Sequence, residues 1–152
     1  MLPTPKTIAI VSGAAEGSHR LTAFDGALLK AGIGNLNLIK VSSILPPHCE
    51  FVEQVNIPAG SLTPTAYGAV MSDEPGQQLA AAVAVGFAAN DYGTIMEHAG
   101  FLSGAEARQQ VIDMVEESFA ARGLELVEVK VAVSEITVVT CASAVAAAVL
   151  WY

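Results

Sequence analysis

A chain of 152 residues is long enough to bury a core and is expected to form a single domain, 1–152. It is 53% hydrophobic and only 14% charged, which leaves little polar surface for a small globule and favours an oligomer that buries apolar faces. The net charge of -8 and the scatter of the seven Lys and Arg residues argue against nucleic acid as a partner.

Predicted elements of the N-terminal half are separated by segments rich in small residues, Gly and Pro. These elements are a strand at 7–11, a helix at 22–31, and strands at 35–43, 49–55 and 65–73. A loop of small residues is expected through Ser18, and Gly32 ends the helix. Turns are predicted at Pro58, Gly60, Pro64 and Pro75-Gly76.

The C-terminal half predicts one long helix among further strands. LAAAVAVGFAA (79–89) fits both a buried strand and an alanine-rich helix, and the strand is preferred. Ser103 and Glu106 form a capping box ahead of a helix at 103–122, which Gly123 ends. The segment 124–139 alternates as strands do. Strands with two helices predict an α+β fold or a layered sandwich.

Membrane, secretion and metal sites are not predicted. The segment 136–152 carries no charge, but its threonine and small-residue content predicts a buried strand rather than a span. No basic n-region precedes TIAIV, so a secretion signal is not indicated and a cytoplasmic location is expected. The cysteines, Cys49 and Cys141, form no CxxC pair and the three histidines are isolated, so no metal is expected in a reduced protein.

Familiar catalytic motifs are incomplete. GIGNLN from Gly32 lacks the third glycine of a dinucleotide fingerprint and follows a helix rather than a strand. GAAEGS at Gly13 lacks the Lys-Ser/Thr of a phosphate loop and is interpreted as a flexible connection. No Gly-x-Ser-x-Gly elbow is present.

The serine pair Ser42-Ser43 stands between an apolar run and Pro46-Pro47. Taken alone, this pattern predicts a turn, because serine hydroxyls bond nearby backbone and proline stops a helix or strand. Four blocks change that interpretation: LTAFDGALLKAGIGNLNLIKVSSILPP, PTAYGAVMSDEPG, IMEHAG and the closing LWY. In order and spacing they resemble the pyruvoyl-dependent arginine decarboxylases, over most of the chain.

The resemblance implies a four-layer αββα sandwich that assembles as trimers of cleaved protomers, sometimes paired into hexamers, with sites at protomer boundaries. The expected reaction converts L-arginine to agmatine and CO2 through a Schiff base between the substrate and a covalent pyruvoyl group. A pyruvoyl-dependent decarboxylase of another amino acid and an uncleaved, non-enzymatic trimer remain alternatives.

Self-cleavage would supply the pyruvoyl cofactor. The Ser43 hydroxyl attacks the Ser42 carbonyl, the peptide becomes an ester, and elimination breaks the chain. Ser43 becomes dehydroalanine and then pyruvoyl. The expected products are a short chain, 1–42, and a long chain, 43–152. Asn37 matches the processing asparagine that would stabilise the developing negative charge on the carbonyl oxygen. Its alternative is a strand-edge asparagine that bonds backbone.

Two carboxylates match catalytic positions of the family. Glu97 matches the general acid that returns a proton to the α-carbon, and an apolar setting would keep it protonated. Its alternative is an ordinary strand glutamate. Asp25 matches the contact to the substrate guanidinium, although Thr22 to Asp25 also fits a capping box. The remaining pocket residues implied by the resemblance are Leu21, Gly34 and Leu36, each of which would also be ordinary as core or turn.

Overall fold

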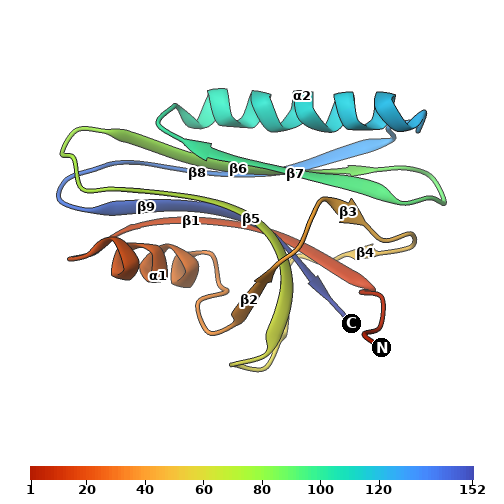
Figure 1. The fold of residues 1–152 in the computed structure, drawn as a ribbon, viewed down its shortest axis with the longest axis horizontal. Coiled ribbons are helices and arrows are strands. Elements are labelled where there is room, and N and C mark those ends of the chain that lie inside the picture. Colours follow the sequence, from red (N-terminus) through yellow and green to blue (C-terminus); the bar gives the residue numbers. More distant parts are fainter.

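Two β-sheets pack face to face, and each carries one helix on its outer surface (Figure 1). The computed structural model describes residues 1–152. The layers therefore follow the order α, β, β, α, which confirms the predicted α+β sandwich.

The first sheet has the strand order β2-β5-β9-β1-β4 and carries α1. Its elements are β1 (Thr7–Glu16), α1 (Arg20–Lys30), β2 (Asn37–Lys40), β4 (Glu50–Phe51), β5 (Leu62–Ser72) and β9 (Ala142–Trp151). The second sheet has the order β3-β7-β6-β8 and carries α2. Its elements are β3 (Ile44–Leu45), β6 (Gln78–Phe87), β7 (Gly93–Gly100), α2 (Gly104–Arg122) and β8 (Glu128–Thr137).

Alanine-rich strands run through the middle of both sheets. On β6, Val83 packs between the sheets while Ala82 and Ala84 pack against α2, and all three are fully buried. Both faces of the strand are covered, which explains the continuous apolar run in 79–89. The strand interpretation is confirmed there and for the uncharged C-terminal segment, which forms β9. No helix is long and apolar enough to cross a membrane.

The loop predicted through Ser18 is wrong, because β1 continues to Glu16 in register with β9. Small residues are needed there because α1 packs closely on the strand. A Cβ on Gly13 would lie 2.3 Å from the carbonyl oxygen of Ala27, a distance that no side chain tolerates. The small-residue composition reflects helix packing rather than a flexible connection.

Two further strand predictions need correction. The strand expected at 49–55 shortens to Glu50–Phe51, which pairs only with the start of β1. Pro64 lies inside β5 rather than in a turn. It stands opposite Ile39 of β2, one residue before β5 begins to pair with β9 at Thr65, so its missing N–H interrupts no bond to β9.

The two helices begin differently. In α2, the Ser103 hydroxyl accepts a hydrogen bond from the Glu106 N–H, and the Glu106 carboxylate accepts one from the Ser103 N–H. These two bonds confirm the capping box. In α1, the N-cap is His19, and the Thr22 hydroxyl accepts the His19 N–H. The alternative that Asp25 completes a cap is therefore wrong, because the helix starts two residues earlier than predicted.

The edge formed by β1, β4 and β8 is closed by hydrogen bonds between the sheets. Ser12 of β1 donates to the Val133 carbonyl at 3.0 Å, and Ser134 of β8 donates to the Val145 carbonyl at 2.8 Å. The Glu16 carboxylate accepts the N–H groups of Val139 and Cys141 in the turn between β8 and β9.

Candidate active site

The serine pair occupies the crossing from one sheet to the other. The last bond to the first sheet runs from the Val41 N–H to the Thr65 carbonyl, at 3.2 Å. The first bond to the second sheet runs from the Ile95 N–H to the Ser43 carbonyl, at 2.7 Å. The peptide bond between Ser42 and Ser43 therefore lies in the short span between these two anchors.

Ser43 and Glu97 share one face of the second sheet. β3 pairs antiparallel with β7, with Ile44 opposite Thr94. Continuing this register by one residue places Ser43 opposite Ile95, as their hydrogen bond also requires. Ile95 belongs to the core between the sheets, and alternation puts Glu97 on the same face. Diagonal neighbours of this kind have Cβ atoms on the order of 7–8 Å apart.

Glu97 is half-buried on β7, opposite Val83 of β6. Burial raises the pKa of its carboxyl group, and the positive charge of Lys40 offsets part of that rise. A carboxyl with a raised pKa holds its proton to higher pH than an exposed glutamate. The electrostatic property expected of a general acid is present, while its catalytic role stays a prediction.

Asn37 stands at the start of β2, and its side chain and backbone are bonded to the turn that precedes β5. Its side-chain amide donates to the Gly60 carbonyl at 2.9 Å, and its N–H donates to the Ser61 carbonyl. The strand is extended from Asn37 to Val41, which separates these residues by about 13 Å at ~3.3 Å per residue. The amide does not reach the Ser42 carbonyl of the same chain, and its processing role stays a prediction.

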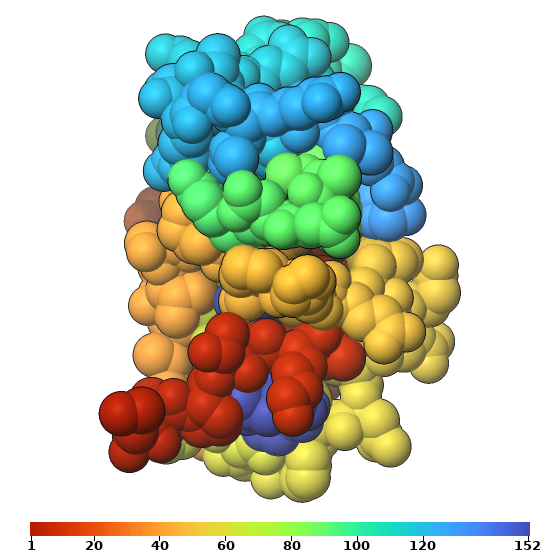
Figure 2. Space-filling view, turned by 90° about the vertical axis from the view of Figure 1, so that its right-hand side faces the viewer, coloured from red at the N-terminus to blue at the C-terminus, as the bar shows by residue number.

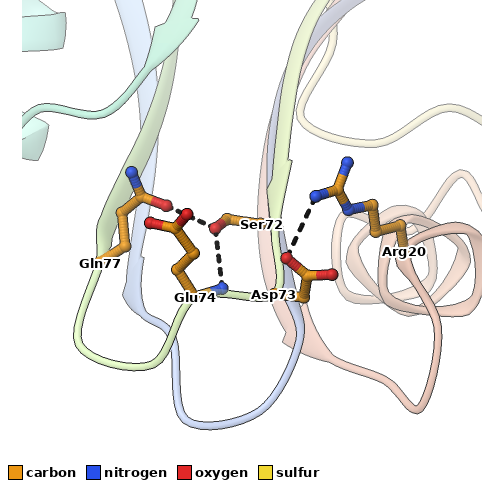
Figure 3. Close-up of polar contacts among 5 residues, drawn as sticks. All are labelled: Arg20, Ser72, Asp73, Glu74 and Gln77. Atoms are coloured by element: carbon orange, nitrogen blue, oxygen red, sulfur yellow. Dashed lines mark hydrogen bonds and ion pairs between the residues drawn. The ribbon is translucent and has the colours of Figure 1, made fainter.

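Leu21 and Asp25 lie on the outer side of α1. They are separated by one helical turn, and Leu21 is 74% exposed while Ala23 and Ala27 face the sheet. The first residue of the helix, Arg20, pairs with Asp73 of the β5–β6 turn at 3.1 Å (Figure 3). This exposed ion pair links the start of α1, near Leu21 and Asp25, to that turn.

Gly34 and Leu36 lie in the connection between α1 and β2. A Cβ on Gly34 would lie 2.6 Å from Cδ2 of Leu29, so glycine lets the connection fold against the helix. Leu36 is half-buried in the cluster between α1 and the first sheet. Both residues shape the same side of the molecule as Asp25.

The predicted residues therefore form two groups. Ser43 and Glu97 face the space between the sheets, whereas Leu21 and Asp25 lie on the outer side of α1. The first sheet and the helix itself separate the two groups within one chain. A site that uses both groups needs two chains.

A shallow pocket of about 270 Å³ adjoins Ser42 and was not predicted from the sequence. Both ends of the chain contribute to its lining, through Leu2, Pro3, Pro5 and Tyr152. Figure 2 shows the N-terminal residues, in red, beside the violet C-terminal end, and the Lys6 N–H donates to the Trp151 carbonyl at 2.7 Å. A larger cavity of about 460 Å³, at the C-terminal end of α1, contains none of the predicted site residues.

Lys40 and Tyr67 were also missed from the sequence. The Lys40 ammonium lies 4.8 Å from the centroid of the Tyr67 ring, which packs against the cluster between α1 and the first sheet. Lys40 precedes the serine pair by two residues and Tyr67 stands within PTAYGAVMSDEPG, but neither position carries a pattern that predicts their contact.

Known proteins resemble the chain over nearly its whole length. The family model described as pyruvoyl-dependent arginine decarboxylase (PvlArgDC) matches residues 7–152. The chain is 47% identical to the pyruvoyl-dependent arginine decarboxylase of Pyrococcus abyssi, over 98% of this chain and 96% of the relative. It is 50% identical to that of Thermococcus kodakarensis (89% and 87%) and 46% identical to that of Methanocaldococcus jannaschii (97% and 91%). The chain belongs to the pyruvoyl-dependent arginine decarboxylase family.

Proposed function

We propose that the protein decarboxylates L-arginine to agmatine and CO2 with a pyruvoyl group made from its own Ser43. The observation that carries this proposal is the shared face of Ser43 and Glu97, at the point where the chain crosses between the sheets. A nucleophilic hydroxyl, its target peptide and a carboxyl with a raised pKa then meet in one place.

Processing cuts the chain into 1–42 and 43–152. The Ser43 Oγ adds to the Ser42 carbonyl carbon, the peptide C–N bond breaks, and an ester forms. Elimination then leaves a Ser42 carboxylate and a dehydroalanine at position 43, which takes up water and releases ammonia to become pyruvoyl. The Ile95 N–H fixes the Ser43 carbonyl throughout, so the residue stays in place while its other side reacts.

The pyruvoyl carbonyl supplies the electron sink that decarboxylation of an α-amino acid needs. Glu97 holds the proton that replaces the lost carboxylate on the α-carbon. Val83 and Ile95 flank the carboxyl group with apolar surface, which keeps water from competing for that proton.

The working unit is proposed to be a trimer of cleaved protomers, alone or paired into a hexamer. The support is the separation of Asp25 from Glu97 within one chain, because a site that uses both carboxylates would take them from two neighbouring protomers. Asn37 is proposed to serve processing from a neighbouring chain, because its own Ser42 is out of reach. Exposed apolar side chains on these surfaces provide area to bury: Leu21 74%, Leu29 55%, Ile39 46%, Ile44 43% and Leu62 65%.

A cytoplasmic location is proposed as well. Its support is the free state of both cysteines, Cys49 and Cys141, which suits a reducing compartment.

Intact mass and a decarboxylase assay test the proposal together. The purified protein should give two chains cut between Ser42 and Ser43, the longer one blocked to Edman sequencing. It should release CO2 from arginine faster than from lysine, ornithine, histidine or aspartate. An uncut chain, a long chain with a free amine, or equal activity on another amino acid would contradict it.

A further inference from the structure

Successive backbone N–H groups of the β8–β9 turn converge on one carboxylate, that of Glu16 at the end of β1. It accepts the Val139 N–H at 2.5 Å. It also accepts the N–H groups of Thr140 at 3.3 Å and Cys141 at 2.9 Å. The Val139 N–H lowers the pKa of the Glu16 carboxyl, and the other two N–H groups act in the same direction. Converging N–H groups of a turn form an anion-binding nest, so Glu16 fills such a nest with a carboxylate of its own chain.

The chain passes directly from this nest into α1. Gly17, the next residue, donates its N–H to the Cys141 carbonyl at 2.9 Å. A Cβ on Gly17 would lie 2.4 Å from the backbone nitrogen of Ala23, so the first turn of the helix lies directly against this segment. The Ala23 N–H in turn donates to the His19 carbonyl at 2.9 Å. The β8–β9 turn therefore holds the residues on which the helix begins.

Hydrogen bonds between two turns complete a ring at the same corner of the sandwich. In the β5–β6 turn, the Gly76 N–H donates to the Val138 carbonyl at 2.7 Å, and the Val138 N–H donates to the Gln77 carbonyl at 2.9 Å. The β5–β6 turn also carries Asp73, which pairs with Arg20 at the start of α1 (Figure 3). That ion pair is exposed and adds little stability. The bonds of the nest are therefore the stronger link between the turns and the helix.

This corner is close to the proposed substrate contacts and far from the serine crossing. Leu21 and Asp25 lie in the first two turns of α1. Leu150, near the end of β9, lines the pocket beside Ser42, whereas Glu16 pairs with the first residue of β9. These two points are on the order of 25 Å apart along the strand. A change at Glu16 is expected to reach the helix start without reaching the scissile peptide.

We propose that Glu16 is a positioning residue for arginine binding: its carboxylate, held in the nest, sets where α1 begins and therefore where Leu21 and Asp25 stand. This proposal rests on the proposed function in giving Asp25 the guanidinium contact. Leu21 and Asp25 are exposed, so the helix backbone rather than packing sets their position. A carboxylate binds a guanidinium well only in a narrow geometry, so a shift of the helix start weakens the contact. Glu16 itself does not touch the substrate.

The first test measures the helix start directly, by amide hydrogen exchange in the purified protein followed by NMR. In Glu16→Ala the amides of Gly17 and Ala23 should exchange about tenfold faster than in the parent, because the nest no longer holds this segment. The Ala107 amide bonds to the Ser103 carbonyl at the start of α2, at 3.0 Å, and should be unchanged. Parental exchange at Gly17 and Ala23 in Glu16→Ala would overturn the proposal.

Formate tests the nest, because it supplies a carboxylate small enough for the space that Glu16→Ala leaves. It should restore slow exchange in this variant and shift the amide signals of Val139 and Cys141, whereas chloride at equal ionic strength should do neither. Glu16→Gln keeps an oxygen acceptor without the charge and should lie between the parent and Glu16→Ala. Equal effects of formate and chloride would contradict a role for the nest.

Steady-state kinetics test the consequence for the substrate. Glu16→Ala should raise KM for arginine about three- to tenfold, while kcat and self-cleavage stay near those of the parent, and formate should lower KM again. The matched control is Glu106→Ala, which removes the carboxylate that bonds the Ser103 N–H at the start of α2. It should lower thermal stability without changing KM. An equal rise of KM in both variants would assign the effect to stability rather than position.

Failure of this proposal and failure of the proposed function give different results. If Asp25→Asn keeps the parental KM, the guanidinium contact is wrong, while the exchange and formate measurements still decide whether Glu16 holds the helix start. If Asp25→Asn raises KM and Glu16→Ala does not, the guanidinium contact stands and Glu16 is not a positioning residue.

Discussion

The two edges of the sandwich contain the same kinds of residues, but these residues have different hydrogen-bond and ion-pair partners. At the β1–β8 edge, the Ser12 and Ser134 hydroxyls donate to carbonyls of the opposite sheet, and Lys130 pairs with Glu128 at 3.2 Å. At the β2–β3 edge, the hydroxyls of Ser42-Ser43 have no such bonds and Lys40 has no carboxylate in contact.

This difference distinguishes hydroxyls that stabilise the fold from hydroxyls that are available to react. A hydroxyl that donates to a carbonyl of the opposite sheet is held in one orientation by that bond and stabilises the fold. A hydroxyl without that bond, beside a peptide fixed at both ends, is available to react. Residue type alone does not distinguish the two edges, whereas the hydrogen-bond and ion-pair partners of these residues do.

The largest expected effect comes from Ser43→Ala. Without the Oγ nucleophile the protein should remain a single chain and show no decarboxylation, with its fold intact. Mass spectrometry and circular dichroism measure this. Cleavage of the variant at the same peptide bond would show that another group attacks Ser42.

Glu97→Gln should cleave itself but lose at least two orders of magnitude in turnover, because an amide has no carboxyl proton to deliver. In the parent, the raised pKa of Glu97 predicts activity at low pH that falls as the pH rises through that value. The control is Glu135→Gln at the other edge. The Glu135 carboxylate accepts the Gly104 N–H at 2.7 Å, so this variant should keep turnover.

Asn37→Ala should slow self-cleavage by about two orders of magnitude, because it removes the proposed donor to the Ser42 carbonyl oxygen. The substitution also removes the bond to Gly60, so thermal unfolding is measured alongside. A folded variant that cleaves at the parental rate would assign Asn37 to the turn alone.

Asp25→Asn should cleave normally and raise KM for arginine about tenfold, since the guanidinium loses a charged acceptor. Its thermal stability should match the parent, because His19 rather than Asp25 begins the helix. Asp113→Asn, an exposed aspartate on α2, is the control that should leave KM unchanged. A parental KM in Asp25→Asn would remove this residue from the substrate site.

The smallest expected effect is at the closed edge. Ser134→Ala removes one hydrogen bond between the sheets and should lower the free energy of unfolding by about 1 kcal/mol. Cleavage and turnover should be unchanged. Loss of cleavage would show that the two edges are not independent.

The sequence predicted strands where polar and apolar residues alternate and predicted a helix where capping residues mark both of its ends. α2 was predicted at its ends because Ser103, Glu106 and Gly123 mark them locally. The extension of β1 to Glu16 was missed because its small residues are required by α1, which is distant in the sequence. Pro64 was wrongly predicted as a turn, because a strand accepts a proline only where its missing N–H interrupts no ladder bond. That depends on which strand pairs with β5 at this residue.

For the site, the sequence supplied residues but not their grouping. Ser43 and Glu97 were predicted through the family resemblance, and the register of β3 with β7 then placed them on one face. The opposite placement of Asp25 depends on the order of the layers. Lys40 depends on a contact with Tyr67 between neighbouring strands, which no spacing along the chain encodes.

The pairing of β1 with β9 has a consequence for refolding. Their ladder runs from Thr7 opposite Trp151 to Glu16 opposite Ala142, so the central strands of the first sheet come from both sides of Ser42-Ser43. Before cleavage, bringing these strands together is a reaction within one molecule, with a rate independent of concentration. After cleavage it is an association of two peptides, and unfolding becomes dependent on dilution. The proposed cut would leave the native structure in place but make its recovery from denaturant a second-order reaction.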